Sequence, residues 1–223
     1  MNAPTDITAG LAEVRRRIAA AAAASGRAAT DVTLVAVTKN HAVDRIAAAI
    51  AAGQLVFGEN RVQEAQAKYP ELRQRHPDLQ LHLIGPLQTN KIRTAVALFD
   101  IIETVDREKL ARGLAAEMVQ SGRRPACLVQ VNIGEEPQKA GVHPVGLDDL
   151  VALCRDELEL PLRGLMAIPP VDEAPAPYFA LLAEMAKRHR LPIVSMGMSA
   201  DFDIAIRLGA THVRVGTAIF GPR

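Results

Sequence analysis

Short apolar runs that are rich in strand-forming residues recur along the chain at an almost even spacing. Eight such runs start about 26 residues apart on average. Each has the length and composition of a buried β-strand. The sequence therefore predicts eight strands. They cover residues 33–39, 55–60, 79–85, 100–106, 127–133, 162–168, 192–197 and 212–219.

Segments with helical spacing lie between these runs, for example over residues 43–52 and 107–120. A strand that is followed by a helical crossover implies a parallel neighbour. Eight strand–helix units close a (β/α)₈ barrel, and 223 residues are a usual length for that fold. We therefore predict an α/β fold in which residues 1–223 form a single (β/α)₈ TIM barrel domain.

The rival architecture is an open, doubly wound sheet. That fold usually carries a glycine-rich turn after its first strand. Here the first predicted strand ends in Thr38, Lys39 and Asn40, and none of these is glycine. The prolines at 169, 170, 175 and 177 follow the sixth strand and indicate a loop before a helix over residues 176–190. The pattern favours the barrel.

Residues 1–26 precede the first strand and predict one extra helix, packed on the barrel. It covers residues 7–25 and ends at Gly26, a residue type common after helix C-termini. Three arginines and six alanines near its middle imitate a targeting signal. Alanine is only weakly apolar and is the best helix former, so a surface helix is the better interpretation. No run approaches the ~18 apolar residues of a membrane span, and we expect no membrane association.

Composition and charge narrow the possible functions. The formal net charge is +1, which gives no basic surface for nucleic acid. Aromatic residues make up 3% of the chain and Trp is absent, so the core must be mainly aliphatic. Cys127 and Cys154 have no CxxC spacing and are expected to be buried free thiols in a reducing cytoplasm. The six histidines lack metal-binding spacing, so no metal site is expected. Because aromatic content is low and no exposed apolar stripe is evident, we expect a monomer.

The active sites of (β/α)₈ barrels lie at the C-terminal ends of the strands, where Lys39 ends the first. Val35, Val37 and Lys39 share one face by the period of two, which directs the amine into the barrel mouth. An amine in an apolar mouth has a lowered pKa and can attack an aldehyde. The alternative is a solvated lysine that only closes a strand.

The last two predicted strands end in residues suited to an anion. Barrels often hold phosphate after these strands, at the start of a helix. Ser199 is predicted to be the N-cap of a helix that runs through Leu208, and its hydroxyl could converge on an anion with Gly216 and Thr217. The alternative is a plain helix cap and a tight turn.

Arg214 lies between two valines in the last predicted strand, and a buried guanidinium needs a partner. Either it forms an ion pair across the barrel with Glu59 or Glu103, or it donates to a ligand heteroatom. Asn60 at the end of the second strand could hydrogen-bond a ligand. His82 is interpreted as a core histidine more readily than as a catalyst.

Six segments of the chain resemble the pyridoxal phosphate homeostasis proteins. These are small cytoplasmic barrels related to the barrel domain of alanine racemase. The similarity runs from the first strand to the last residues, and its motifs are specific when taken together. The segments read VAVTKN, FGENRVQEAQAK, HLIGPLQTNK, GLMAIPP, SMGMSADFDIAI and VRVGTAIFG.

The resemblance implies a site for pyridoxal 5′-phosphate. It assigns Lys39 as the lysine that holds the cofactor as an imine and Arg214 as the partner of the pyridine nitrogen. It also implies that Lys139, in a loop after the fifth strand, takes part in cofactor handling; the alternative for this lysine is a solvated loop cation. Three of the implied residues hold the phosphate: Ser199, Gly216 and Thr217. Two others line the pocket: Asn60 and Met198.

The expected role is storage and delivery of the cofactor, without a catalytic residue. An arginine cannot accept the ring-nitrogen proton, so the ring would be a weak electron sink. Tyr69 is interpreted as the end of a helix and Tyr178 as the start of one, so neither is placed to act as a second base. Pyridoxal phosphate-dependent apo-enzymes are the expected recipients. The alternatives are a weak amino-acid racemase and an aldolase that uses Lys39 without a cofactor.

Overall fold

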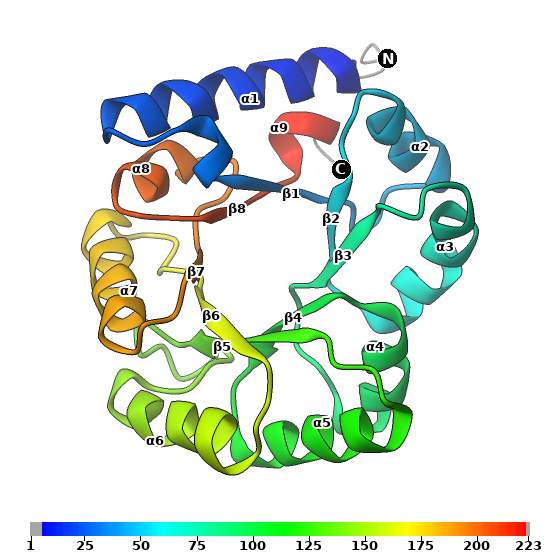
Figure 1. Cartoon of the computed structure of the whole chain (residues 1–223). Helices are drawn as coiled ribbons and strands as arrows, with labels where there is room; N and C mark the ends of the chain where they lie inside the picture. The colour runs from blue at the N-terminus through cyan, green and yellow to red at the C-terminus, as the bar shows by residue number, and fades with distance from the viewer. Residues whose placement is uncertain (1–5, 222–223) are drawn as a thin grey trace.

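The computed structural model describes residues 6–221. Its eight strands are all parallel and form a closed barrel in chain order, as Figure 1 shows. The (β/α)₈ prediction is therefore confirmed. The strands are β1 (Thr33–Val37), β2 (Val56–Glu59), β3 (Gln80–Leu83), β4 (Ile101–Val105), β5 (Ala126–Val131), β6 (Leu162–Ala167), β7 (Ile193–Ser195) and β8 (His212–Val215).

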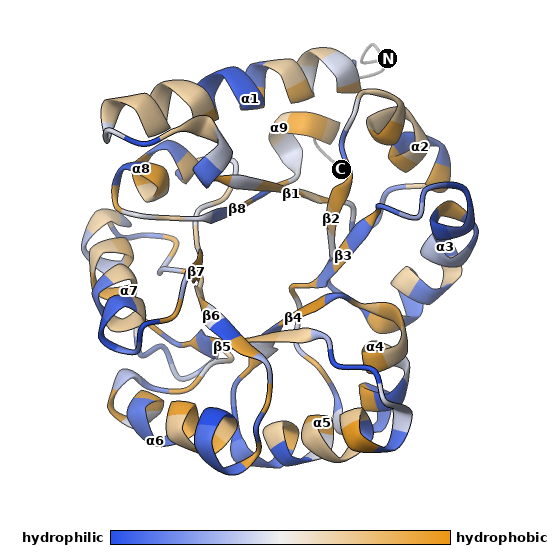
Figure 2. Ribbon diagram, viewed as in Figure 1, coloured by the Kyte–Doolittle hydropathy of each residue, from blue (hydrophilic) through white to orange (hydrophobic). Residues whose placement is uncertain are grey.

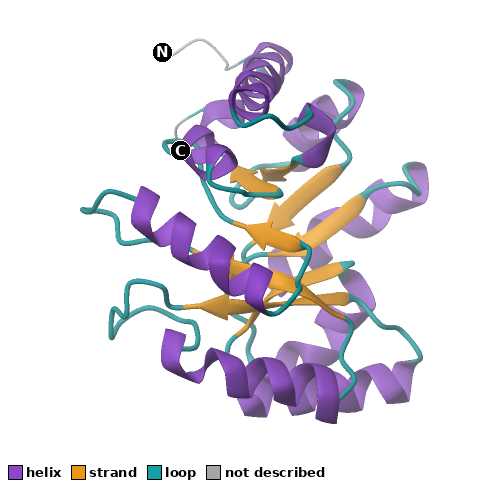
Figure 3. Cartoon of the chain, turned by 60° about the vertical axis from the view of Figure 1, so that its left-hand side comes forward, coloured by secondary structure: helices purple, strands orange, loops and turns teal. Residues whose placement is uncertain are grey.

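Helices surround the barrel and connect its strands (Figures 1 and 3). The predicted helices over residues 43–52, 107–120 and 176–190 are confirmed within one or two residues at each end. The α-helices are α1 (Ile7–Ala24), α2 (Val43–Ala51), α3 (Val62–Arg75), α4 (Ile92–Leu98), α5 (Glu108–Ser121), α6 (Leu147–Ala152), α7 (Ala176–Arg188), α8 (Phe202–Arg207) and α9 (Thr217–Phe220). Shorter helical turns are η1 (Ala29–Asp31), η2 (Thr89–Lys91), η3 (Pro144–Gly146) and η4 (Leu153–Glu157).

Helix α1 is the predicted extra helix, and it packs against α8 and α9 beside the strands that close the barrel (Figure 1). Asp6 caps its start by accepting a hydrogen bond from the amide of Ala9. The chain leaves the helix through Ser25 and Gly26, whose φ of +71° favours glycine. Residues 1–5 of the predicted N-terminal segment lie outside the described residues, as do residues 222–223. The prediction of one domain over 1–223 therefore stays a prediction.

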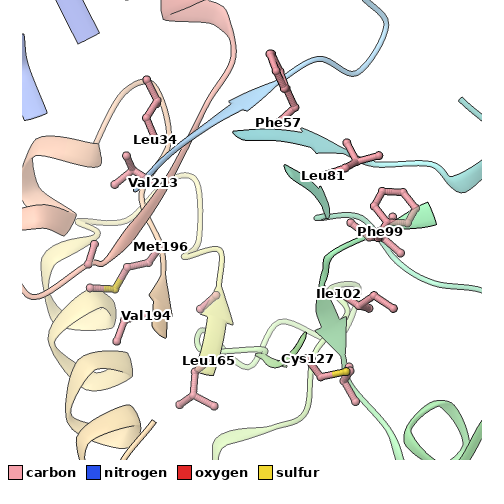
Figure 4. Close-up of a cluster of buried hydrophobic side chains, with 14 of the residues drawn as sticks. Leu34, Phe57, Leu81, Phe99, Ile102, Cys127, Leu165, Val194, Met196 and Val213 are labelled. Atoms are coloured by element: carbon pink, nitrogen blue, oxygen red, sulfur yellow. The ribbon is translucent and has the colours of Figure 1, made fainter. Parts of the chain in front are cut away.

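The main hydrophobic core lies between the barrel and the helices. Figure 4 shows part of it, including Leu34, Phe57, Leu81 and Val213, which are all buried. The surrounding helices are amphipathic, with hydrophobic and hydrophilic stretches interleaved along them (Figure 2). Alternate residues of the strands point the other way, into the barrel interior. That interior holds a buried polar group described below.

The eighth strand is shorter than predicted, and the assignment of residues 216–219 to it is wrong. Strand β8 pairs with β1 up to Val215, and beyond that point the chain turns into α9. Because these residues have no neighbouring strand, their backbone forms helical hydrogen bonds: the amide of Phe220 donates to the carbonyl oxygen of Gly216 at 2.9 Å. Ile219 and Phe220 are buried, and α9 packs against α1.

Two further helix boundaries also differ from the prediction. Ser199 is not the N-cap of α8; that position is taken by Asp201, because a turn over residues 198–201 precedes the helix. Asp201 stabilises this turn by accepting a 2.6 Å hydrogen bond from the amide of Met198. Tyr69 does not end a helix, since α3 continues past Pro70 to Arg75. Pro70 removes one backbone donor, but buried contacts continue on either side of it.

Cys127 and Cys154 are free and buried, as predicted. Burial raises the pKa of both thiols, that of Cys154 to about 12, so neither is a reactive thiolate. Among residues 6–221, no helix combines the length and apolar character that crossing a membrane requires.

Candidate functional site

A cavity of about 280 Å³ opens at the C-terminal end of the barrel, between the ends of β1, β2, β7 and β8. Its volume lies near the lower end of the range for small-molecule sites, roughly 300–1,000 Å³. Tertiary structure brings all seven predicted cofactor residues to this one cavity. They are Lys39, Asn60, Met198, Ser199, Arg214, Gly216 and Thr217.

Lys39 lies in the turn directly after β1 and is half-buried. The backbone on both sides of it is held by α3. The Nζ of Lys68 donates to the carbonyl oxygen of Thr38 at 2.9 Å, and the amide of Asn40 donates to Glu64 Oε1 at 2.5 Å. Lys68 and Glu64 are one helical turn apart and form an ion pair at 2.5 Å. The loop that carries Lys39 is therefore anchored to a helix.

A buried polar cluster supports this anchor on the helix side of the barrel. The hydroxyl of Thr38 donates to Glu59 Oε1 at 2.7 Å and lies 2.6 Å from the hydroxyl of Tyr69. Burial raises the pKa of Glu59, which Thr38 and Lys68 partly offset. Burial and the charge of Glu59 raise the pKa of Tyr69 well above its usual value. Tyr69 is thus a neutral structural hydroxyl behind Lys39.

The guanidinium of Arg214 forms the polar floor of the cavity, and the residue is only 4% exposed. Its Nη1 donates to Ser195 Oγ at 2.7 Å, and its Nη2 donates to the carbonyl of Ala167 at 2.9 Å. Glu103 lies 4.0 Å from Nη1 and forms an ion pair with it. Of the two predicted partners, Glu103 is the one found, while Glu59 pairs with Lys68. Arg214 has an ion-pair partner and also faces the cavity.

Glu103 belongs to a hydrogen-bonded group inside the barrel, beneath the cavity. Its Oε1 lies 2.7 Å from His82 Nδ1, and its other oxygen accepts from Ser195 Oγ at 2.5 Å. Burial alone would raise the pKa of Glu103, but His82, Arg214 and Ser195 together lower it to about 2. His82 is therefore a structural member of this group and does not line the cavity. The neighbouring His212 is kept neutral, because burial lowers its pKa to about 4.

The predicted phosphate-binding residues lie side by side, although not as the sequence suggested. The Ser199 hydroxyl accepts a 3.4 Å hydrogen bond from the amide of Ala218, so it meets the first turn of α9. At Gly216 a Cβ atom would lie 3.3 Å from both Cβ and the carbonyl oxygen of Val37, which explains the small residue. Thr217 is exposed at the rim. The segment after β7 is thus joined to the turn after β8.

Sequence reasoning missed the apolar walls of the cavity, formed by Ile84, Ile168 and Ala200 together with Val37. The signal was available, because Ile84 and Ile168 follow directly on β3 and β6, where side chains reach the barrel mouth. Lys139 is not among the lining residues; its Nζ donates to the carbonyl of Pro169 at 3.1 Å and pairs with Glu136. Its role in cofactor handling stays a prediction.

No group of three or more His, Cys, Asp or Glu side chains among residues 6–221 could hold a metal ion. The residues that line the cavity offer an amine, a guanidinium, hydroxyl groups and backbone amides. This set is suited to a ligand that carries an aldehyde and an anionic group.

Comparison with known proteins agrees with this chemistry. Residues 11–223 match the family model described as the N-terminal domain of alanine racemase. The pyridoxal phosphate homeostasis protein of Escherichia coli K12 is 40% identical, over 98% of this chain and 97% of that protein. The chain belongs to the pyridoxal phosphate homeostasis protein family. The family member from Pseudomonas aeruginosa is 44% identical, over 97% of this chain and 96% of its own length.

A solved structure of another family member contains the cofactor. PipY of Synechococcus elongatus, with pyridoxal phosphate bound, has 38% sequence identity and a TM-score of 0.79. The match covers 96% of this chain and 100% of that one. The relatives from Escherichia coli and Pseudomonas aeruginosa are named for homeostasis of the cofactor and not for a reaction. The family resemblance drawn from the six sequence segments is confirmed.

Proposed function

We propose that the protein binds pyridoxal 5′-phosphate in this cavity through Lys39 and acts in homeostasis of the cofactor as a reversible carrier or buffer. One observation carries the proposal. The closed barrel gathers an amine, a buried guanidinium and a hydroxyl-rich turn around one cavity of about 280 Å³. The bound cofactor supplies an aldehyde and an aromatic ring that can accept electrons.

The residues at the cavity fit each part of this cofactor. The amine of Lys39 suits the aldehyde, and the guanidinium of Arg214 suits the ring nitrogen as a permanent donor. The phosphate would be held at the turn formed by Ser199, Gly216 and Thr217, where hydroxyls and closely approaching backbone are available. Two further residues would line the pocket around the ring: Asn60 and Met198.

Arg214 supports a role without sustained catalysis. Enzymes that use this cofactor usually place an Asp at the ring nitrogen, so that the ring is protonated and draws electrons. A guanidinium donates there but cannot accept the proton. Glu103 and the backbone of Ala167 hold Arg214 cationic and fixed. The electron-accepting capacity of the ring would therefore be weak.

The positions of the tyrosines support the same interpretation. Racemases of this barrel type need a second base opposite the lysine. Neither Tyr69 nor Tyr178 is among the described residues that line the cavity. Tyr69 is buried behind β1, and Tyr178 is half-buried, packs against the core and donates to Glu173 at 2.5 Å. Weak racemase activity is the alternative function, and no observation favours it.

A carrier must let its cargo leave. Met198 and Thr217, at the rim of the cavity, are both exposed, so the mouth is accessible to solvent and to a partner. We infer that pyridoxal phosphate-dependent apo-enzymes in the cytoplasm are the recipients and that the protein delivers the cofactor as a monomer. The net charge of +1 gives no support for a nucleic-acid partner.

The test is the visible absorption spectrum of purified protein before and after borohydride, followed by peptide mapping. We expect a visible band that borohydride removes and a reduced label on Lys39. The variant Lys39→Ala should lose at least about 90% of the label, whereas Lys187→Ala, on the exposed end of α7, should retain it. Colourless protein that releases no cofactor in acid would favour a cofactor-free aldolase. Turnover of any L-amino acid above ~1 s⁻¹ would show a racemase instead.

A further inference from the structure

The cavity floor is connected to a chain of hydrogen bonds that crosses the interior of the barrel. Glu103 lies on β4, whereas Ser195 and Arg214 lie on β7 and β8. In a closed barrel of eight strands these elements are on opposite sides, as Figure 1 shows. These hydrogen bonds join His82 to Glu103 at 2.7 Å, Ser195 to Glu103 at 2.5 Å and Arg214 to Ser195 at 2.7 Å. The cavity floor is therefore supported from the opposite wall.

Both carboxylate oxygens of Glu103 take part in these hydrogen bonds. The side chain of Glu103 is 0% exposed, and a buried carboxylate is unfavourable unless it is paired and hydrogen-bonded. Oε1 meets His82, and Oε2 meets Ser195 and lies within 4.0 Å of the Arg214 cation. The two buried charges compensate each other, and the hydroxyl of Ser195 lies between them.

The hydroxyl of Ser195 has a direction, because it carries a single proton. That proton is donated to Glu103, which leaves the lone pairs of Oγ to accept from Arg214. The ionised carboxylate is acceptor-only, so it can only orient the hydroxyl in this way. The second bond of the guanidinium, to the carbonyl of Ala167, fixes its plane. A guanidinium has further N–H groups beyond these two bonds, and Arg214 lines the cavity.

We propose that Glu103 and Ser195 are positioning residues that hold the Arg214 guanidinium at the floor of the cavity and so set the electronic state of the cofactor ring. This inference rests on the proposed function, because its readout is the bound cofactor. Neither residue lines the cavity. Both act through Arg214.

The experiment compares reconstituted wild-type protein with Glu103→Gln, Ser195→Ala and Ser195→Thr. Label on Lys39 after borohydride reports binding of the cofactor. Two measurements report the environment of its ring: the position of the visible absorption band, and the rate at which pyridoxal phosphate is released into an excess of a trapping agent. Glu103→Gln and Ser195→Ala should retain the label, shift the band and release the cofactor about tenfold faster or more. Ser195→Thr keeps a hydroxyl and should show the band position and the release rate of the wild-type protein.

Gln54→Ala is the matched control. Gln54 is a buried polar residue at the other end of the strands, where its side chain bonds the carbonyls of Leu34 and Val56 at 2.8 and 2.7 Å. This variant should lower the melting temperature without changing the spectrum. A similar spectral shift in the control would overturn the inference, because general loosening would then explain the shift.

Unchanged band position and release rate in Glu103→Gln and Ser195→Ala would also overturn it. If Glu103→Gln does not fold, the Ser195→Ala and Ser195→Thr pair decides the result alone, since it changes one hydroxyl. Absence of label on Lys39 in the wild-type protein would instead contradict the proposed function. The two failures are therefore distinguishable.

Discussion

Lys68 donates from Nζ to the backbone carbonyl of Thr38, 2.9 Å away, and so holds the residue that precedes Lys39. The same ammonium group pairs with Glu59 at 3.1 Å, and its own side chain is only 10% exposed. The contact joins α3 to the end of β1.

Replacing Lys68 with methionine should destabilise the fold and weaken cofactor binding. The change keeps the length of the side chain but leaves Glu59 buried without a cation, which typically costs about 3–5 kcal/mol. Urea denaturation measures the free energy of unfolding. Arg112→Met is the control, because its ion pairs with Glu108 and Glu157 are exposed and should contribute less than about 1 kcal/mol. Equal losses in both variants would contradict the anchoring role of Lys68.

Arg214→Glu should change the visible spectrum of the bound cofactor. The substitution replaces a permanent donor at the cavity floor by a carboxyl group close to Glu103, and two such groups share a proton readily. A ring nitrogen beside this group would become protonated, and the absorption band would move. Arg93→Glu, on an exposed position of α4, should leave the band where it is. An unshifted band in Arg214→Glu would mean that Arg214 is only a structural ion-pair partner.

Acid should destabilise the protein in a window set by Glu103. Its pKa falls from an ordinary 4.5 to about 2 in the folded protein, so its stabilising contribution is complete above pH 4.5 and is lost as pH falls toward 2. The difference corresponds to a loss on the order of 3 kcal/mol. Unfolding free energies measured across this range should show the slope, and Glu103→Gln should flatten it. The same slope in both proteins would contradict the assignment.

His212 should add a second, milder acid sensitivity. Its pKa is lowered from 6.5 to about 4 by burial, so the unfolded chain takes up a proton in this range while the folded protein does not. Stability should therefore fall as pH drops from 6.5 to 4, by at most ~3 kcal/mol, since the side chain is partly accessible. His212→Gln should remove this slope. His143→Gln, at an exposed loop position, should retain it.

Much of the fold could be predicted because the strand pattern is local. The period of two and the even spacing of eight apolar runs are properties of the chain itself, and they predicted the parallel barrel. The end of β8 could not be predicted in this way. Residues 216–219 have the composition of a continuing strand. The last pair between β1 and β8 is Ala36 with Val215, however, and beyond it the chain turns into α9.

The candidate site was predictable for a related reason. Strand ends meet at one rim in this fold, so Lys39, Asn60 and Thr217 could be placed in one region before the structure was known. The partner of Ser199 could not, because its contact with the amide of Ala218 joins the ends of two strands through space. The apolar walls were missed although Ile84 and Ile168 also follow strand ends, because an apolar side chain does not by itself indicate ligand chemistry.

The strand count, the parallel topology and the residue types at the barrel rim follow from the amino-acid sequence, since these depend on periodicity and on the chemistry of single side chains. Which charged side chains meet follows from the folded arrangement. Arg214 could have paired with Glu59 or Glu103, and the barrel places Glu103 inside and Glu59 on the helix side with Lys68. Pairing across a closed barrel depends on whether each side chain points into the barrel or toward the helices, and on how far along its strand it lies. The spacing of residues along the sequence carries no information about distances across the barrel.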